Sequence, residues 1–468
     1  MRELLDSPES EFLAVYGRRR VGKTFLIERF YAEQMVFSVT GINQPRKRFQ
    51  LDNFMDALNR LVPEDQRIEE TPTSWLLAFR HLRDHLESIV NDNKKVIFID
   101  ELPWLATRGS AFLSALENFW NGWASKRNDI LLVVCGSAAS WMIKNVVRNR
   151  GGLHNRITRR MRLMPFDLYE TEQFLQKRGV QLERYDVLQL YMVMGGIPHY
   201  LKEVRRGQSA TQAIDSICFT RDGLLQSEFA DLYAGLFSRP ELYIEIVRQL
   251  AANPSGLTRT ELLRRTKLSS GGSTSRIFDA LEESGFIHRY YPVGKNSKNG
   301  IYKLSDFYSA FYLKFVVKSR ATGVGTWIKL SRTSSWRAWS GYAFERLCLA
   351  HLPQIERGLG ISGIFTEAST WYRKGTNDTA RAQIDLVIVR SDRTISLCEM
   401  KFSQDEFIID KTYAISWRRK IAAFREETQT KSSLFLTFIT TYGLKQNEYA
   451  NSMVQQELSM DALFEPMF

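Results

Sequence analysis

The sequence predicts an α/β protein in which a parallel sheet with a helical lid is followed by a helical segment with a β hairpin and then by a second α/β segment. Three observations predict this class. A short apolar strand runs into a glycine-containing loop and a helix at residues 12–30, later apolar strands end in polar residues near positions 100 and 137, and the pattern changes at residue 239. Strands that alternate with helices in this way are typical of α/β domains.

The loop at residues 17–24 has the sequence GRRRVGKT, which fits the phosphate-binding pattern GxxxxGK[ST], the P-loop. The two glycines let backbone N–H groups point at phosphate oxygens, the lysine supplies positive charge for the β- and γ-phosphates, and the threonine hydroxyl can ligate Mg²⁺. Residues 12–16 predict the preceding strand and residues 25–30 the following helix. We therefore predict a binding site for ATP and Mg²⁺ formed by Gly17, Arg18, Arg19, Arg20, Val21, Gly22, Lys23, Thr24 and Phe25, with Thr24 as a metal ligand and Lys23 also acting in catalysis.

Two further apolar strands are expected to complete this site. Residues 94–101 end in Asp100 and Glu101, as expected for a buried parallel strand at the carboxyl edge of a sheet. Asp100 is placed to hold Mg²⁺ and Glu101 to polarise the attacking water; the alternative, solvated acids that cap a core strand, is weakened by the preceding P-loop. The strand at 130–137 ends in Ser137, which could hydrogen-bond the nucleophilic water or γ-phosphate, or could cap the next helix.

These segments together resemble the archaeal-type ATPase family in the AAA+/STAND group of P-loop NTPases, over roughly residues 10–235. The resemblance rests on YGRRRVGKT, VIFIDELPWL and CGSAASWM, on LHNR (153–156) running on to LMPF (163–166), and on GIP (196–198). It implies that Arg156 faces the γ-phosphate and that Pro198 lies near the adenine. The residues also allow a solvated or nucleic-acid-facing basic cluster around Arg156 and a simple turn at Pro198.

The start of the chain departs from that family. Its members usually begin with a short segment that carries a Gly-Arg pair and an acidic helix before the P-loop strand. This chain opens with Met-Arg-Glu-Leu-Leu, which resembles the tail of that helix. We therefore expect part of the natural N-terminal edge, and its contacts to the adenine, to be missing from this sequence.

Composition limits the class of protein. A chain of 468 residues is too long for one core, so two or three domains are expected. An apolar content of 44% and a mean hydropathy of -0.28 indicate a soluble, cytoplasmic protein without a membrane span or signal peptide. The four scattered cysteines fit reduced thiols better than a disulfide framework or zinc site. A net charge of +12 suggests a polyanionic partner, first of all nucleic acid.

The middle of the chain predicts a winged helix. Helices are expected at 242–250, 258–263 and from residue 273, followed by strands at 286–293 and 300–304. Basic residues on the hairpin tip and near the third helix would suit phosphate contacts; they are Lys295, Lys298, Arg264, Arg265, Lys267 and Arg276. The alternative is that this module packs against other parts of the protein or binds a partner protein.

The last part of the chain carries a second group of charged residues. Glu345 lies on an amphipathic helix at 342–349, and Asp385 and Glu399 interrupt two apolar strands joined by a turn at 390–393. Burying a lone carboxylate costs several kcal/mol unless a cation or hydrogen bonds compensate. Because Lys401 lies beside two such carboxylates on neighbouring strands, a metal site is the most economical explanation.

A helix Glu, then QID, then a strand with ExK resembles the PD-(D/E)xK nuclease superfamily over about residues 335–445, and particularly the nuclease-like domain appended to archaeal-type ATPases. The resemblance implies that Asp385 and Glu399 hold Mg²⁺ with help from Glu345. It also implies that Lys401 orients the attacking water or stabilises the phosphate, and that Gln383 lines the site. The acids lie on a hairpin without a preceding proline, and exposed acids on an edge hairpin remain the alternative. The following helix interleaves basic and aromatic residues, which would suit either a nucleic-acid backbone or packing on the sheet; they are Lys411, Tyr413, Trp417, Arg418, Arg419 and Lys420.

The expected domains are a P-loop ATPase core (1–166), a helical lid (167–238), a winged helix (239–306), a linker helix (307–334) and a PD-(D/E)xK nuclease-like domain (335–468). Two functions fit this organisation. One is an ATPase whose nucleotide state controls DNA binding and Mg²⁺-dependent cleavage. Such a protein could form a homo-oligomer, and no membrane partner is expected. The other is a nucleotide-controlled switch or scaffold whose nuclease-like domain binds nucleic acid or a partner without cleaving. The four charged residues of the second site favour the first function.

Overall fold

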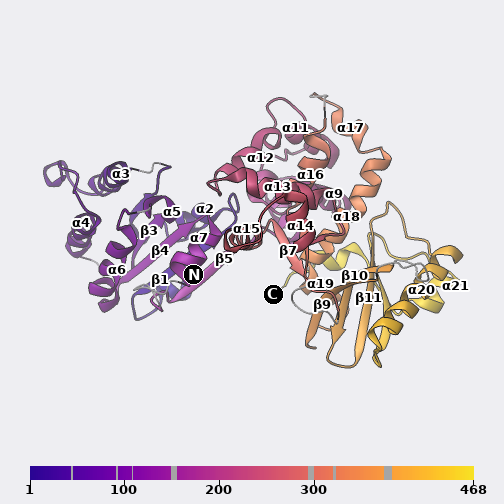
Figure 1. Ribbon diagram of the computed structural model, residues 1–468. Coiled ribbons are helices and arrows are strands. Elements are labelled where there is room, and N and C mark those ends of the chain that lie inside the picture. Colours follow the sequence, from indigo (N-terminus) through magenta and orange to yellow (C-terminus); the bar gives the residue numbers. More distant parts are fainter. Residues whose placement is uncertain are drawn as a thin grey trace. The chain divides into compact units, whose positions relative to one another are not determined.

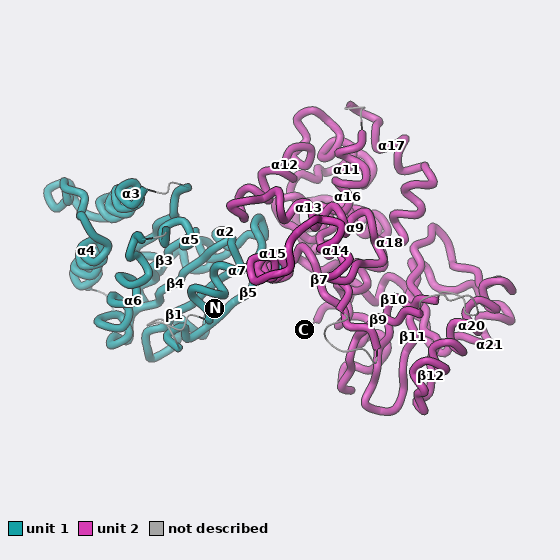
Figure 2. Tube along the Cα trace, in the orientation of Figure 1, with its two compact units in different colours: residues 1–164 teal, residues 165–468 magenta. Residues whose placement is uncertain are grey.

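The computed structural model describes residues 1–43, 46–90, 93–107, 109–148, 155–293, 300–319, 323–373 and 382–467. Leu153 and His154 of the arginine motif, and Lys295 and Lys298 of the expected hairpin tip, lie outside the described residues. The chain divides into two compact units, residues 1–164 and 165–468, which Figure 2 colours separately. Each unit is described by itself.

The first unit contains a five-stranded parallel sheet in the order β2-β3-β4-β1-β5 (Figure 1). Its strands are β1 (Glu11–Gly17), β2 (Met35–Thr40), β3 (Lys95–Asp100), β4 (Ile130–Gly136) and β5 (Arg159–Leu163). Its α-helices are α1 (Arg2–Leu5), α2 (Lys23–Phe30), α3 (Lys47–Asn59), α4 (Trp75–Ser88), α5 (Leu102–Leu105), α6 (Phe112–Gly122) and α7 (Ala139–Met142). Because all strands run in parallel, the ends of β1, β3 and β4 meet at one edge of the sheet.

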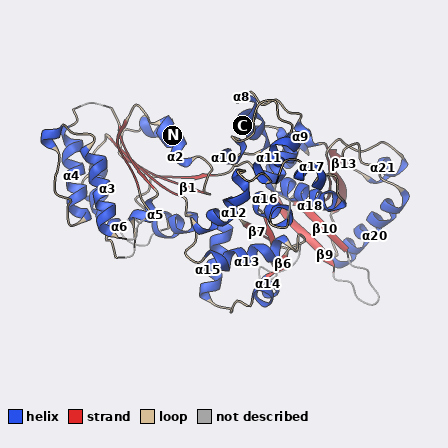
Figure 3. Cartoon of the chain, turned by 90° about the horizontal axis from the view of Figure 1, so that it is seen from above, coloured by secondary structure: helices blue, strands red, loops and turns tan. Residues whose placement is uncertain are grey.

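Both faces of this sheet are buried. Alternate residues of the strands pack against α3, α4 and α6 on one face, with Phe54, Trp75 and Phe79 among the largest side chains there. The other alternate residues pack against α1 and α2 through Leu4, Ile27 and Tyr31. Figure 3 shows α3, α4 and α6 on one side of the sheet and α2 on the other. Double coverage explains why β3 and β4 are continuous apolar runs.

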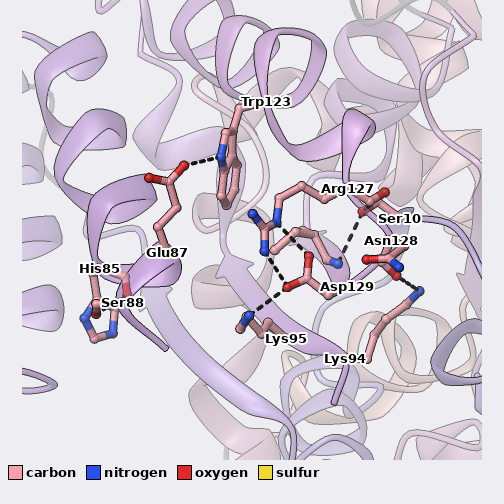
Figure 4. A network of polar contacts seen from close by, with 11 residues as sticks. Ser10, His85, Glu87, Ser88, Lys94, Lys95, Trp123, Arg127, Asn128 and Asp129 are labelled. Atoms are coloured by element: carbon pink, nitrogen blue, oxygen red, sulfur yellow. Dashed lines mark hydrogen bonds and ion pairs between the residues drawn. The ribbon is translucent and has the colours of Figure 1, made fainter. Parts of the chain in front are cut away.

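A network of hydrogen bonds and ion pairs lies at the amino-terminal edge of the sheet, opposite the P-loop (Figure 4). Lys94 Nζ donates hydrogen bonds to the backbone oxygens of Ser7, Glu9 and Asn128 at 2.5–2.8 Å. Asp129 accepts two bonds of 2.7 Å from the Arg127 guanidinium and one of 2.7 Å from Lys95. The network joins the starts of β1, β3 and β4, so we assign it a structural role.

The Asp129 carboxylate makes the stability of this unit depend on pH. The hydrogen bond from Arg127, with help from Lys95, holds the pKa of Asp129 well below its usual range. Its stabilising contribution is therefore complete above the ordinary carboxyl pKa of about 4 and is lost as the pH falls further. Asp129→Asn is expected to lower the free energy of unfolding by about 2 kcal/mol at pH 7. Denaturant unfolding should show this difference shrinking below about pH 4; an equal difference at every pH would contradict the assignment.

The second unit begins with five helices, α8 (Leu168–Lys177), α9 (Arg184–Met194), α10 (Pro198–Leu201), α11 (Ala210–Cys218) and α12 (Leu224–Ala234). They are followed by α13 (Pro240–Ala251), α14 (Arg259–Thr266) and α15 (Gly272–Glu283), and by an antiparallel sheet in the order β6-β8-β7. The strands of that sheet are β6 (Leu257–Thr258), β7 (Ile287–Tyr290) and β8 (Ile301–Leu304). Thr258 and Glu261 form a capping box at the start of α14, as the predicted cap at Thr258 requires.

The segment expected as one linker helix consists of shorter pieces. They are α16 (Phe307–Phe311), a π-helical turn (Tyr312–Val316) and α17 (Thr326–Leu330). Buried aromatic side chains hold these pieces against α9, α11 and α12; Trp327, for example, stacks on Phe219 at a centroid distance of 5.7 Å. The segment is therefore part of a core rather than a linker, and its many aromatic residues fit this buried position.

The C-terminal part contains a mixed sheet in the order β13-β12-β11-β10-β9. Its strands are β9 (Thr366–Arg373), β10 (Ala382–Arg390), β11 (Thr394–Lys401), β12 (Ser433–Thr440) and β13 (Gln456–Leu458). Its helices are α18 (Ser334–Ala350), α19 (Leu352–Gly358), α20 (Lys411–Thr428) and α21 (Glu448–Met453). α18 packs against β11, and α20 covers a core that includes Trp371, Trp417 and Phe424. Among the described residues, no helix is both long and apolar enough to cross a membrane.

Candidate functional site

The P-loop connects β1 to α2 as predicted, and its glycines are required by geometry. Gly17 has φ +151°, and a Cβ atom there would lie 2.2 Å from the backbone oxygen of Leu163 on the neighbouring strand β5. Gly22 has φ +89° and immediately precedes α2. Both positions therefore favour glycine strongly. Within the loop Val21 is buried, whereas Phe25 in the first turn of α2 is exposed.

Lys23 is buried at the start of α2. Its Nζ donates hydrogen bonds to the backbone oxygens of Gly17, at 3.2 Å, and Arg18, at 2.8 Å. Burial lowers the pKa of Lys23, while Asp100 and Glu101 are among the groups that oppose the shift. A lysine held by loop carbonyls, next to two carboxylates, is a mobile cation that a phosphate group could attract away from them.

Thr24 and Asp100 meet at the carboxyl edge of the sheet. Thr24 Oγ1 donates a 2.6 Å hydrogen bond to Asp100 Oδ2, and Asp100 Oδ1 accepts a 2.8 Å bond from the Glu101 backbone N–H. A hydroxyl and a carboxylate side by side are oxygen donors of the kind that Mg²⁺ prefers. The two side chains could therefore hold Mg²⁺ in the way predicted from the sequence.

Glu101 and Ser137 form a pair across the ends of β3 and β4. Ser137 Oγ donates to Glu101 Oε1 at 2.5 Å, and the Ser137 backbone N–H donates to Oε2 at 3.3 Å. The capping alternative for Ser137 is wrong, because Ala138 precedes α7 and no side chain caps that helix. Glu101 itself has φ 45° and ψ 47°. A non-glycine residue rarely adopts this left-handed conformation, which is a form of strain that gathers at functional sites.

Two further residues, Arg156 and Pro198, are implied only by the resemblance. Arg156 is exposed shortly before β5, and within the described residues no hydrogen bond joins it to the P-loop. Pro198 is the first residue of α10 and belongs to the second unit. In that unit the backbone N–H of Phe166 donates a 2.7 Å hydrogen bond to the oxygen of Gly196. A Cβ atom added at Gly196 would lie 1.8 Å from the Phe166 oxygen, so this close approach requires glycine.

The second group of charged residues comes together in the C-terminal sheet. Leu386 pairs with Cys398 across β10 and β11, so Asp385 and Glu399 occupy the next cross-strand position. The register between β10 and β9 shifts between Ile384 and Val387, which places Asp385 in an irregularity of the strand. Such bulges often redirect a side chain beside a functional site.

Glu399 is buried within the sheet, where two donors hold it and a further lysine lies nearby. Lys401 Nζ lies 2.6 Å from Oε1, the Tyr413 hydroxyl donates to the same oxygen at 2.5 Å, and Lys420 Nζ lies 3.9 Å from Oε2. Only 7% of Glu399 is exposed, so the alternative of exposed acids on an edge hairpin is wrong for this residue. Tyr413 and Lys420 both project from α20, the helix in which basic and aromatic residues alternate.

Asp385 and Glu345 complete the carboxylate cluster. Asp385 Oδ1 accepts a 2.5 Å hydrogen bond from Gln383 and lies 3.9 Å from Lys303 Nζ. Burial, followed by repulsion from Asp385, raises the pKa of Glu345 on α18 to about 8. We call Glu345, Asp385, Glu399 and Lys401 the carboxylate site.

The described residues contain no group of three or more His, Cys, Asp or Glu side chains arranged to hold a metal ion. A metal at the carboxylate site would therefore have two carboxylate ligands, Asp385 and Glu399, and would keep other positions for water and phosphate. Mg²⁺ commonly binds in this way, through one or two carboxylates with several waters retained. The donor set fits Mg²⁺ on that basis.

Comparison with known proteins identifies the N-terminal part of the chain. Residues 1–204 match a protein family described as an ATPase domain predominantly from Archaea. This part of the chain is an archaeal-type ATPase domain. The match includes the P-loop strand, the strand that ends in Asp100 and the strand that precedes Ser137.

Relatives of the whole chain are distant. An uncharacterized protein of Methanocaldococcus jannaschii, MJECL04, is 24% identical over 86% of this chain and 85% of its own length. Among solved structures, the Walker-type ATPase paby2304 of Pyrococcus abyssi is 16% identical with a TM-score of 0.46, covering 67% of this chain and 93% of its own. The Aeropyrum pernix ORC2 protein, solved as ADPNP-ADP complexes, is 16% identical with a TM-score of 0.41, covering 71% and 92%.

Several contacts around the two sites could not be predicted from sequence motifs. In the ATPase domain, the bond between Ser137 and Glu101 joins residues 36 positions apart. At the carboxylate site, Lys303 comes from β8 and had no signal of its own. Tyr413 had a partial signal, because it belongs to the helix whose alternating basic and aromatic residues suggested either nucleic-acid contact or packing.

Proposed function

We propose that this protein binds and hydrolyses ATP in its first unit, and that the nucleotide state controls DNA binding and Mg²⁺-dependent phosphodiester cleavage by its C-terminal part. The observation that carries the proposal is the convergence of Glu345, Asp385, Glu399 and Lys401 from α18, β10 and β11. A cluster of partly buried charges at this density is costly to fold. Such clusters are therefore typical of functional sites.

Each residue of the ATP site has a chemical role in this proposal. Lys23 contacts the β- and γ-phosphates, and Thr24 and Asp100 hold the Mg²⁺ that neutralises phosphate charge. Glu101 polarises the attacking water, and Ser137 positions the Glu101 carboxylate through its 2.5 Å bond. Arg156 would contribute charge at the γ-phosphate, in the same chain or across a subunit boundary. Mass measurement with and without a non-hydrolysable ATP analogue distinguishes these two arrangements.

Glu101→Gln tests the assignment of the base. The amide keeps the shape of the side chain but cannot accept a proton, so we expect ATP binding to persist while hydrolysis falls by about 100-fold. Calorimetric titration and phosphate release measure the two properties separately. Glu28→Gln, an exposed change on α2, is the matched control. Normal turnover by Glu101→Gln would show that another group activates the water.

We further propose that residues 239–306 form a winged helix that contacts DNA. Support comes from three helices followed by the β7–β8 hairpin, and from exposed basic residues on α14 and near the start of α15; these are Arg264, Arg265, Lys267 and Arg276. The net charge of +12 adds a favourable long-range field for a polyanion. DNA is therefore the proposed partner.

The proposed cleavage is hydrolysis of a phosphodiester. A bond forms between the water oxygen and phosphorus, the ester P–O bond breaks, and the products are a phosphate monoester and a hydroxyl. Lys401, which is fixed by Glu399, would orient the water and donate to a phosphate oxygen, and Gln383 would hold Asp385 in place. When bound by Asp385 and Glu399, Mg²⁺ would supply positive charge to the phosphate.

One observation favours the second candidate, a nucleotide-controlled switch or scaffold that does not cleave. Glu399 already accepts from Lys401 and Tyr413 at Oε1 and has the Lys420 ammonium 3.9 Å from Oε2, so protein cations balance its charge without a metal. Plasmid nicking with Mg²⁺, in the presence and absence of ATP, separates the two candidates. Cleavage that depends on Glu399 supports the enzyme, and its absence on every substrate supports the switch.

A further inference from the structure

The three-stranded sheet β6-β8-β7 contributes a lysine to the carboxylate site. Lys303 lies on β8, and its Nζ is 3.9 Å from Asp385 Oδ1 on β10. Only 10% of its side chain is exposed. Its ammonium group also lies 5.7 Å from the centroid of the Tyr290 ring on β7. The lysine is therefore enclosed, with its charge directed to the carboxylates of another sheet.

Two hydrogen bonds to backbone oxygens fix this arrangement. Arg346 Nε donates a 2.7 Å hydrogen bond to the backbone oxygen of Leu304. Beyond β7, the Val293 backbone N–H donates a 3.0 Å bond to the oxygen of Thr370 on β9. Because Leu304 follows Lys303 and Arg346 follows Glu345, the first bond sets the position of the lysine relative to the cluster. Both sides of the hairpin are thus joined to the C-terminal part.

Lys303 has hydrogen-bonding capacity that the described protein groups do not use. A separation of 3.9 Å is too long for a hydrogen bond, and Asp385 Oδ1 already accepts one from Gln383 at 2.5 Å. Among the described residues, no oxygen accepts a hydrogen bond from Lys303 Nζ. An ammonium carries three donors, and solvent still reaches Lys303 Nζ, so water can occupy these donors until an anionic ligand replaces it. The geometry is therefore that of a cation prepared for an anionic ligand.

We propose that Lys303 is a phosphate-contacting residue of the carboxylate site and that the site is complete only when β8 supplies it. This inference rests on the proposed function, since the anion is a non-bridging oxygen of a nucleic-acid phosphate. During hydrolysis that oxygen gains negative charge while the water oxygen bonds to phosphorus and the ester oxygen leaves. Lys303 would stabilise this charge from one sheet, and Lys401 would act from the other.

A different role is available to the same residue and leads to different results. If Lys303 only balances the charge of Asp385 and Glu345, it competes with bound cations. Its removal would then leave cleavage intact and allow the site to work at lower Mg²⁺ concentrations. If Lys303 contacts phosphate, its removal weakens nucleic-acid binding and slows cleavage, and arginine restores much of the loss because it keeps the charge.

The test uses the full chain in four forms: wild type, Lys303→Met, Lys303→Arg and the control Lys329→Met, which removes an exposed lysine on α17. Methionine keeps the length and apolar stem of the side chain. Plasmid nicking across a Mg²⁺ series measures cleavage. Fluorescence anisotropy with a short single-stranded DNA in Ca²⁺, repeated across a salt series, measures binding without catalysis. Thermal unfolding checks that each variant is folded.

We expect Lys303→Met to reduce the cleavage rate by about 100-fold. The loss of one phosphate contact should also reduce the steepness of log affinity against log salt by about 1. Lys303→Arg should recover the cleavage rate to within about tenfold of wild type and should restore the salt slope, because it keeps the charge. Lys329→Met should match wild type in both measurements. Unchanged cleavage at lower Mg²⁺, or unchanged affinity and salt slope, would overturn the inference. If wild type cleaves nothing, the proposed function fails, and the binding series alone then decides whether Lys303 contacts phosphate.

Discussion

Lys23→Ala is expected to abolish ATP binding and, with it, ATP hydrolysis. The Lys23 ammonium is held 2.8 Å from the Arg18 oxygen and 3.2 Å from the Gly17 oxygen, within the loop that would surround the phosphates. Charge-assisted hydrogen bonds contribute about 1.5–3 kcal/mol each. Losing two of them to phosphate oxygens corresponds to a decrease in affinity of at least about 100-fold. Calorimetric titration with ATP measures this directly.

The folded state should tolerate the same change. Because burial lowers the pKa of Lys23, the charged form is disfavoured in its surroundings, so alanine is expected to leave the unfolding temperature of the chain nearly unchanged. Lys126→Ala, an exposed change in the same unit, is the control. If Lys23→Ala bound ATP with the wild-type affinity, the assignment of the P-loop would be wrong.

Glu399→Ala is expected to reduce DNA cleavage to background, a loss of at least about 1,000-fold. The substitution removes a proposed metal ligand and leaves Lys401 and Tyr413 without their acceptor. Glu399→Gln should lose cleavage as well, because the amide has no charge, but it retains an oxygen for the Tyr413 hydroxyl. Plasmid nicking with Mg²⁺ measures both variants.

Comparison of the two variants separates chemistry from folding. If alanine lowers the unfolding temperature and glutamine does not, while both are inactive, Glu399 acts in the reaction. Glu406→Gln, an exposed change beyond β11, should retain full activity. The enzyme hypothesis is rejected if wild type and Glu399→Ala are equally inactive on every DNA and RNA form tried.

Features encoded in short stretches of sequence could be predicted. The strand before Gly17, the strands that end near Asp100 and Ser137, and the hairpin that carries Asp385 and Glu399 lie where their apolar patterns indicated. Such patterns depend on which faces of a strand are buried, which is a local property. The same reasoning predicted the second half of α18 and the helices between residues 240 and 283.

Features that depend on distant residues could not be predicted. Lys303 and Asp385 are far apart in sequence, and only the docking of β8 beside the C-terminal sheet brings them within 3.9 Å. We expected residues 307–334 to form a linker helix, yet their aromatic rings form part of a core. The left-handed backbone at Glu101 likewise has no signature in its residue type.

The bond between Arg346 and Leu304 has a practical consequence for dissecting this protein. A C-terminal fragment that starts at residue 335 would look like a natural unit by sequence, but it would lack the strand that accepts this bond and the lysine beside it. The half-buried Arg346 side chain and the buried aromatic faces of Trp336 and Trp339 would then be more exposed to solvent. Fragments for crystallisation or activity assays should therefore begin upstream of α13, so that β8 remains attached to the domain that it completes.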